Sequence, residues 1–251
     1  MIRFLAWLAG CCAFAGTAAA ADTLVAVASN FATTARAVAS AYEREHGHSI
    51  RITTGATGRL YAQIVNGAPF DALLAADAER PALLEASGHA VGGSRFTYAI
   101  GSLVLWSADP AFADTDCREA LANLGDRKLA IANPETAPYG TAARQFLVAE
   151  DLWDRVSPNL VYGENIAQTL QFVASGNARL GLVANAQAVD DRLPAATCRF
   201  AVPPSEYAPL EQQAVLLRHG RDDPAAAGFL AFLGAAEARA LIRAHGYEVP
   251  R

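Results

Sequence analysis

The sequence predicts an α/β protein with sheets between layers of helices, and three observations support this fold class. Short apolar runs of strand length alternate along the chain with segments whose apolar residues recur at helical spacing, as in α/β layer folds. Gly and Pro clusters, such as those at residues 55–58 and 67–69, separate the segments. The chain has 251 residues, which is long for one domain and suits two.

Residues 1–21 are predicted to be a secretory signal peptide. Arg3 is followed by a short apolar stretch, and small residues lead up to a cleavage position near residues 20–21. Two alternatives stay open. Residues 4–21 are just long enough for a transmembrane anchor, although they are rich in Ala and Gly. The segment that ends at Cys11 resembles a bacterial lipoprotein box, which would place a lipid on this cysteine.

The first part of the remaining chain is expected to form three strands and two helices. Buried strands are predicted at residues 23–28, 49–53 and 71–76. The first helix begins at Ser29 or Asn30, both favoured helix caps, and ends at Gly47. The second follows the turn at residues 55–58 and carries Leu60, Tyr61 and Ile64.

A second set of strands and helices follows the largely apolar run at residues 98–106. Strands are predicted at residues 129–132, 180–183 and 213–217, and helices at residues 141–149, 166–175 and 224–244. The repetition of the α/β pattern in both parts of the chain indicates two α/β units.

Small polar or Gly residues recur where a strand ends and a helix begins. They lie at residues 28–30, 55–58 and 133–141. Helix N-termini offer unpaired N–H groups and a partial positive charge, which together favour anions. The carboxyl ends of strands are also where α/β folds bind ligands. Plain helix capping is the alternative at each position taken alone.

Composition and motifs exclude several classes of function. The net charge is −5 without a basic run, which argues against a nucleic-acid partner, and 53% hydrophobic residues argue against a disordered chain. No phosphate-binding P-loop, nucleophile elbow, zinc-protease motif or Cys-x-x-Cys pair occurs. His46 and His48 suit a helix end better than a metal site. We therefore expect no enzyme activity and no metal ligands.

Two cysteines remain once the signal peptide is removed, namely Cys117 and Cys198. In an exported chain such a pair predicts one disulfide. The alternative is two buried free thiols.

Several motifs resemble the periplasmic molybdate-binding proteins that serve bacterial ABC importers, over nearly the whole chain after the signal peptide. They comprise residues 27–31, 55–64 with 66–71, 75–77, 94–101, 133–134 with 137–140, and 163–166. The most specific is Gly-Ala-Pro-Phe-Asp at residues 67–71, which follows a helix containing Gln-Ile.

This resemblance implies a two-lobed periplasmic binding protein fold of type II. Each lobe is expected to hold a mixed sheet flanked by helices, with the ligand cleft between the lobes. Residues 22–101 plus 214–251 would form the first lobe and residues 102–213 the second. On this division the predicted disulfide lies within the second lobe and leaves the hinge free.

The resemblance also implies the residues that hold a tetrahedral oxyanion. Ser29 and Asn30 match donors of the first lobe, and Thr57 matches a second hydroxyl donor. Tyr139 and Ile166 match backbone N–H donors of the second lobe. Gly58 and Ala184 are weaker candidates. Ala184 stands where many relatives have a Tyr hydroxyl, so we hypothesise that the Tyr139 hydroxyl replaces that donor.

We therefore expect a monomeric periplasmic binding protein that captures molybdate or tungstate without a cofactor and presents it to a membrane permease. Every proposed donor is neutral, which suits a fully deprotonated dianion. A receptor for sulfate, thiosulfate or another oxyanion is the alternative within transport. A periplasmic enzyme that acts on a small anionic substrate is the alternative of another class.

Overall fold

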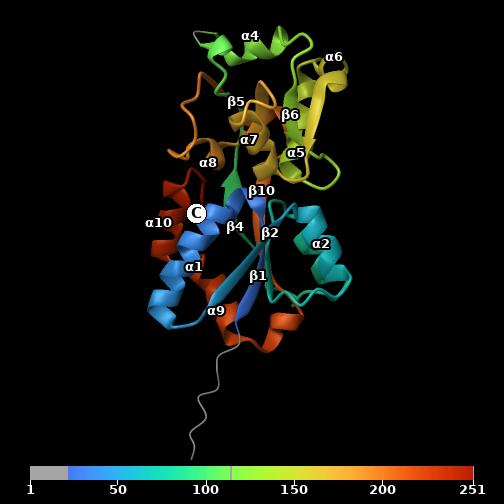
Figure 1. Ribbon diagram of the computed structural model, residues 1–251. Helices are drawn as coiled ribbons and strands as arrows, with labels where there is room; N and C mark the ends of the chain where they lie inside the picture. Colours follow the sequence, from blue (N-terminus) through green and yellow to red (C-terminus); the bar gives the residue numbers. More distant parts are fainter. Residues whose placement is uncertain (1–21, 114, 251) are drawn as a thin grey trace, which may run out of the picture.

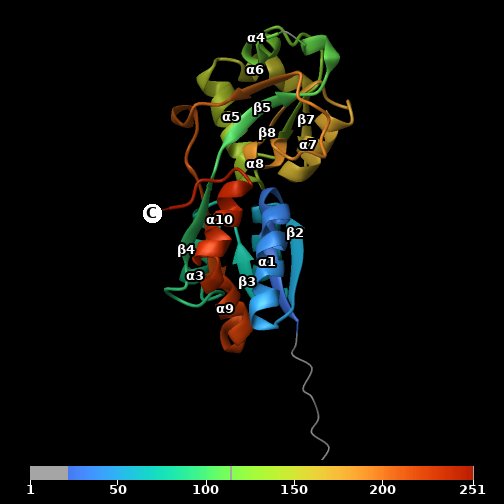
Figure 2. The same cartoon turned by 90° about the vertical axis from the view of Figure 1, so that its left-hand side faces the viewer.

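The computed structural model describes residues 22–113 and 115–250. These residues form two lobes, one above the other in Figure 1, and each lobe holds a five-stranded mixed sheet between helices (Figures 1 and 2). The predicted signal peptide and the alternative lipid site at Cys11 lie outside the described residues. The α/β fold class and the two-lobed architecture are confirmed.

The sheet of the first lobe contains a strand from the far end of the chain. Its order is β2-β1-β3-β10-β4, with β1 (Thr23–Ala28), β2 (Ile50–Gly55), β3 (Ala72–Leu74), β4 (Phe96–Gly101) and β10 (Leu210–Leu216). β1 pairs in parallel with β2 and β3, whereas β10 is antiparallel to both β3 and β4. The chain therefore returns from the second lobe to complete the sheet of the first lobe with β10.

Helices cover both faces of this sheet because consecutive residues of its central strands β1, β3 and β10 are buried, so that both faces need cover. One face packs against α1 (Ala32–His46), α9 (Pro224–Phe232) and α10 (Ala236–Ala244), and the other against α2 (Thr57–Val65) and α3 (Glu79–Ala86). In α1, Ala35, Val38 and Tyr42 lie on one buried stripe, as the helical spacing predicts. Gly47 ends α1 with φ of 71°, a left-handed conformation that glycine adopts readily.

The second lobe repeats this strand arrangement. Its order is β7-β6-β8-β5-β9, with β5 (Leu103–Ser107), β6 (Leu129–Ala132), β7 (Leu160–Gly163), β8 (Leu180–Ala184) and β9 (Cys198–Ala201). Its helices are α4 (Cys117–Ala122), α5 (Pro138–Ala149) and α6 (Trp153–Val156) on one face, α7 (Ile166–Ala174) on the other, and α8 (Asn185–Ala188) after β8. Here too the fourth strand in the order, β5, is antiparallel to both its neighbours.

A disulfide joins Cys117 at the start of α4 to Cys198 in β9, with the two Cα atoms 5.4 Å apart. This confirms the predicted disulfide and excludes the alternative of two free thiols. Both cysteines belong to elements of the second lobe, so the bond does not link the lobes.

Two element predictions are corrected by the structure, and one run without an assigned element is resolved. The run at residues 98–106 lies in two strands, β4 and β5, which belong to different sheets and are separated by Ser102. The helix expected at residues 224–244 is the pair α9 and α10, which is broken around Gly234 and bent by 61°. The strand expected at residues 213–217 begins earlier, at Leu210. The sequence does not reveal this start, because buried glutamines interrupt the apolar run of the strand.

Other elements were not predicted, or begin elsewhere. Helices α3, α4, α6 and α8 and strands β7 and β9 were not predicted, because they are short and weakly periodic. Helix α5 begins at Pro138 rather than at residue 141, since a proline suits the first helical position. The lobe boundaries at 101/102 and 213/214 stay a prediction, although β10 runs across the second of them.

Among residues 22–113 and 115–250, no single helix is long and apolar enough to cross a membrane. The bent pair α9 and α10 reaches the length and apolar composition of a membrane span only when the two helices are taken together. Phe229, Leu233 and Ile242 of this segment pack in the core of the first lobe.

Candidate functional site

A small cavity lies between the two lobes and contains every main residue of the predicted site. It is lined by Ala28, Ser29, Asn30, Gly55, Ala56, Thr57, Ala76, Ala137, Pro138, Tyr139 and Ile166. Its empty volume, including its mouth, is about 190 Å³. The structure thus brings together Ser29, Asn30, Thr57, Tyr139 and Ile166, which are far apart in the sequence.

The fold places these residues together because each follows the carboxyl end of a strand. Ser29 and Asn30 follow β1, and Thr57 follows β2. Tyr139 and Ile166 follow β6 and β7 after short loops. Since β1 and β2 run in parallel, as do β6 and β7, their carboxyl ends meet at one edge of each sheet, and the two edges face one another across the cavity.

Three helices begin at the cavity, namely α2, α5 and α7. The residues before α2 and α5 provide no side-chain cap. Asn165 caps α7 through the N–H groups of Ala167 and Gln168. The N–H groups of Thr57, Tyr139 and Ile166 donate to no acceptor within the described residues. Unpaired N–H groups at helix starts are suited to binding an anion.

Two buried hydroxyl groups add donors. Thr57 is 1% exposed, and its Oγ1 accepts a hydrogen bond from the Ala76 N–H at 3.0 Å. This bond occupies an acceptor position and leaves the hydroxyl proton free to be donated. Within the described residues the Ser29 Oγ makes no hydrogen bond, while the Ser29 carbonyl lies 3.4 Å from the Nε2 of Gln187.

The side-chain amide of Asn30 is used within the protein. Its Nδ2 donates to Gln212 Oε1 at 2.9 Å and to Tyr247 Oη at 3.1 Å. Both protons of the amide nitrogen are therefore used inside the protein. The backbone N–H of Asn30 is the group that remains for a ligand.

Tyr139 is 1% exposed and lines the cavity, but its hydroxyl lies against the strands that connect the lobes. The hydroxyl oxygen accepts from Gln212 Nε2 at 3.3 Å, and a methyl group added to Gly101 would overlap it. Burial raises the pKa of Tyr139 well above its ordinary value, so the hydroxyl keeps its proton at neutral pH. Its hypothesised role as a ligand donor stays a prediction.

The two weaker candidates lie outside the cavity. The Gly58 N–H donates to the Thr136 carbonyl at 2.8 Å, across the gap between α2 and the second lobe, so it is not available to a ligand. Ala184 ends β8, pairs with Leu103 of β5 and is absent from the lining.

Helix termini supply the positive potential of the cavity, because no lining residue carries a charged side chain. Arg59, next to Thr57, is half exposed and pairs with Glu164 at 3.1 Å. Within the described residues, no group of three or more His, Cys, Asp or Glu side chains is placed to hold a metal ion.

Sequence reasoning missed Gln212, a fully buried side chain that touches two lining residues. The available signal was a pair of glutamines directly before the apolar run at residues 214–217.

Comparison with known proteins gives concordant results. Residues 23–248 match the family described as bacterial extracellular solute-binding protein. The chain is 46% identical to the molybdate-binding protein ModA of Azotobacter vinelandii, over 92% of this chain and 91% of that protein. It is 41% identical to ModA of Rhodobacter capsulatus, over 92% and 89%. The solved structure of the Azotobacter vinelandii periplasmic molybdate-binding protein superimposes with a TM-score of 0.86 at 38% identity, over 92% of this chain and 100% of that chain.

Proposed function

Because the chain belongs to the bacterial extracellular solute-binding protein family, we propose that it captures molybdate between its lobes and delivers it to the permease of an ABC importer. Like its relatives, it is a solute-binding protein, and it is not an enzyme. The relatives that match over nearly the whole chain are named molybdate-binding.

The observation that carries the proposal is a set of neutral donors around one cavity without a charged lining side chain. Hydrogen bonds to a charged partner contribute about 1.5–3 kcal/mol each. Several such bonds can outweigh the cost of ordering and reach the roughly 8 kcal/mol of a micromolar site. A protonated oxyanion would favour a carboxylate to accept its proton, and no lining residue carries one.

The same donors suit tungstate, which resembles molybdate in charge and size. Sulfate is smaller and would leave some donors too far away. We also propose that residues 1–21 are removed and that the remaining chain acts in the periplasm as a monomer.

Titration calorimetry of the protein with molybdate, tungstate, sulfate and phosphate tests the proposal. We expect heat and saturation with the first two anions and little with the others. Binding of sulfate without binding of molybdate would overturn it.

A variant pair locates the site. Thr57→Val removes one hydroxyl donor and the acceptor of the Ala76 N–H, so we expect molybdate affinity to fall by about 2–3 kcal/mol, or roughly 30- to 150-fold. Thr57→Ser keeps the hydroxyl and serves as the matched control. Unchanged affinity in Thr57→Val, or a loss in Thr57→Ser as large as in Thr57→Val, would contradict the role of the hydroxyl as a donor.

A further inference from the structure

Gln212 lies in β10, the strand through which the chain re-enters the first lobe, and its side chain is completely buried. Buried amides are costly unless their donors and acceptors are paired. The partners of Gln212 come from both lobes. Its Oε1 accepts from Asn30 Nδ2 at 2.9 Å, and its Nε2 donates to Tyr139 Oη at 3.3 Å.

The orientation of this amide is fixed by its neighbours. Tyr247 Oη donates its proton to the Asn30 carbonyl at 2.8 Å and therefore accepts from Asn30 Nδ2. The second proton on Asn30 Nδ2 then goes to Gln212 Oε1. Tyr98 Oη lies 3.1 Å from Gln212 Oε1 and 3.1 Å from the Ala75 carbonyl, so its one proton is shared between these two acceptors. The nitrogen of the Gln212 amide is thus left to face Tyr139.

A β-bulge helps to position Gln212. Between β4 and β10 the register shifts after Gln212, which pairs with Ala99, while Gln213 pairs with Thr97. Tyr98 is the extra residue of β4. Bulges of this kind redirect side chains and are common beside binding sites.

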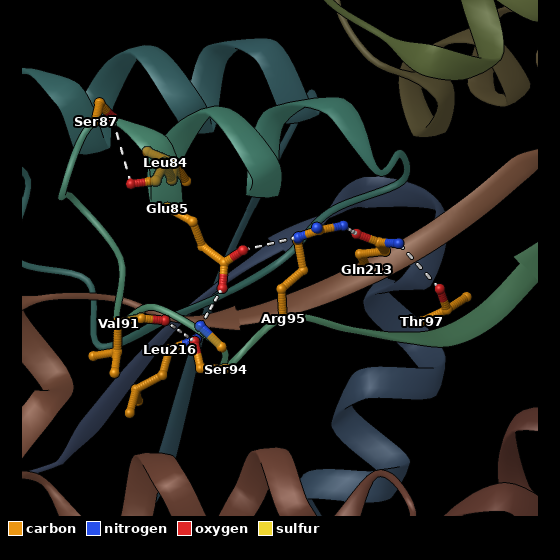
Figure 3. A network of polar contacts seen from close by, with 10 residues as sticks. Leu84, Glu85, Ser87, Val91, Ser94, Arg95, Thr97, Gln213 and Leu216 are labelled. Atoms are coloured by element: carbon orange, nitrogen blue, oxygen red, sulfur yellow. Dashed lines mark hydrogen bonds and ion pairs between the residues drawn. The ribbon is translucent and has the colours of Figure 1, made fainter.

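The neighbouring glutamine has the same chemistry but different partners. Gln213 Oε1 accepts from Arg95 Nη1 at 2.7 Å, and its Nε2 donates to Thr97 Oγ1 at 3.1 Å. Arg95 is held in turn by Glu85 at 3.0 Å (Figure 3). None of these partners lines the cavity. Gln213 therefore provides an internal control for Gln212.

We propose that Gln212 is a positioning residue of the oxyanion site, which sets the Asn30 segment of one lobe against the Tyr139 segment of the other. The inference rests on the proposed oxyanion binding. Holding both donor segments in place before the ligand arrives reduces the ordering cost of binding. Gln212 touches no ligand and acts through its two partners.

The test compares Gln212→Leu with Gln213→Leu. Calorimetry with molybdate measures affinity, and thermal unfolding of the ligand-free protein measures stability. Both variants lose buried hydrogen bonds, so we expect both melting temperatures to fall. Molybdate affinity is expected to fall about tenfold or more in Gln212→Leu and less than about twofold in Gln213→Leu. An equal loss in the two variants would overturn the proposal.

Gln212→Glu gives a second readout that a purely structural role would not produce. A protonated Glu keeps one acceptor oxygen and one donor, as Gln does. Once ionised, it can no longer donate to Tyr139, and its charge repels a dianion. Burial raises the pKa of a carboxyl group, so molybdate affinity should fall as pH rises from about 6 to 9 while that of the unmodified protein stays level.

If molybdate affinity depends on pH in the same way in Gln212→Glu and in the unmodified protein, the inference is wrong. Gln212→Glu also provides the test if Gln212→Leu does not fold. If the unmodified protein binds no molybdate at all, the proposed function fails. If it binds and the Gln212 variants bind equally well, only the positioning role fails.

Discussion

Two of the regions in which the lobes touch one another near the cavity have opposite character. The hinge network consists of Asn30, Tyr98, Tyr139, Gln212 and Tyr247, all buried and neutral. The α2 contact consists of the Gly58–Thr136 backbone hydrogen bond and the exposed Arg59–Glu164 ion pair.

The difference shows which contacts set geometry. Buried hydrogen bonds cannot be exchanged for water, so they hold their partners in one arrangement. The side chains of Arg59 and Glu164 are 52% and 59% exposed, and such pairs contribute about 0–1 kcal/mol. We infer that the hinge network fixes the relative position of the donor segments and that the α2 contact is decided by steric fit rather than charge.

The largest expected effect concerns the hinge network at alkaline pH. Burial raises the pKa of Tyr98, Tyr139 and Tyr247 above the ordinary tyrosine value. Below about pH 10 both folded and unfolded chains keep these protons. Above about pH 10 the unfolded chain releases these protons and the folded chain does not. The free energy of unfolding therefore falls by about 1.4 kcal/mol per pH unit for each tyrosine, or by about 4 kcal/mol per pH unit for all three.

Denaturant unfolding at several pH values between about 9 and 11 measures this slope. Tyr247→Phe, which removes one of the three groups, should make it shallower. A free energy of unfolding that does not change over this range would show that the hinge tyrosines ionise in the folded protein.

The next effect probes the α2 contact through Gly58. A Cβ at this position would lie 2.9 Å from the Thr136 carbonyl oxygen and 3.1 Å from its Cα. Gly58→Ala should therefore keep the lobes apart and weaken molybdate binding by about 2 kcal/mol, or about 30-fold. Because alanine favours the helix over glycine, the ligand-free protein should not lose stability.

Calorimetry and thermal unfolding together test this combination. Gly92→Ala, at a position where an added methyl group meets open space, is the control. Unchanged affinity in Gly58→Ala would mean that binding does not need the close approach of α2 to the second lobe.

A smaller effect is expected for Tyr139→Phe. If the hydroxyl only accepts from Gln212, its loss removes one neutral hydrogen bond, and affinity should fall by about 1 kcal/mol, or about fivefold. A donor to the oxyanion would contribute about 1.5–3 kcal/mol instead. Tyr207→Phe, which removes a buried hydroxyl bonded to the Leu103 N–H, is the control. No change in affinity would exclude both roles.

The smallest effect is expected for the exposed ion pair. Arg59→Ala and Glu164→Gln should each change molybdate affinity by about twofold or less. A double-mutant cycle measured at low and high salt gives the coupling energy of the pair. A coupling above about 1 kcal/mol would contradict the view that the α2 contact depends on fit alone.

The five main site residues were predicted from the resemblance to the molybdate-binding family, residue by residue. The local pattern of a strand followed by small residues and a helix start points independently to the segments of four of them, Ser29, Asn30, Thr57 and Tyr139, but not to Ile166. The alternation of strands and helices likewise predicted both lobes.

The role of Gln212 could not be predicted in this way. It depends on the register shift between β4 and β10 and on partners more than 70 residues away in the sequence. The division of residues 98–106 between two strands depends on distant partners in the same way. Gly101 and Ser102 interrupt the apolar run, but only the pairing of β4 with β10 and of β5 with β8 assigns its halves to different sheets.

The place of β10 in the first sheet has a consequence for the order of folding. The second lobe is built from one uninterrupted stretch of chain, whereas β10 lies between β3 and β4 and is synthesised more than 100 residues after them. Until β10 arrives, β3 and β4 have no strand between them. Since pairings between distant residues form slowly, we expect the second lobe to fold first and the first lobe, with the hinge network, to be completed last.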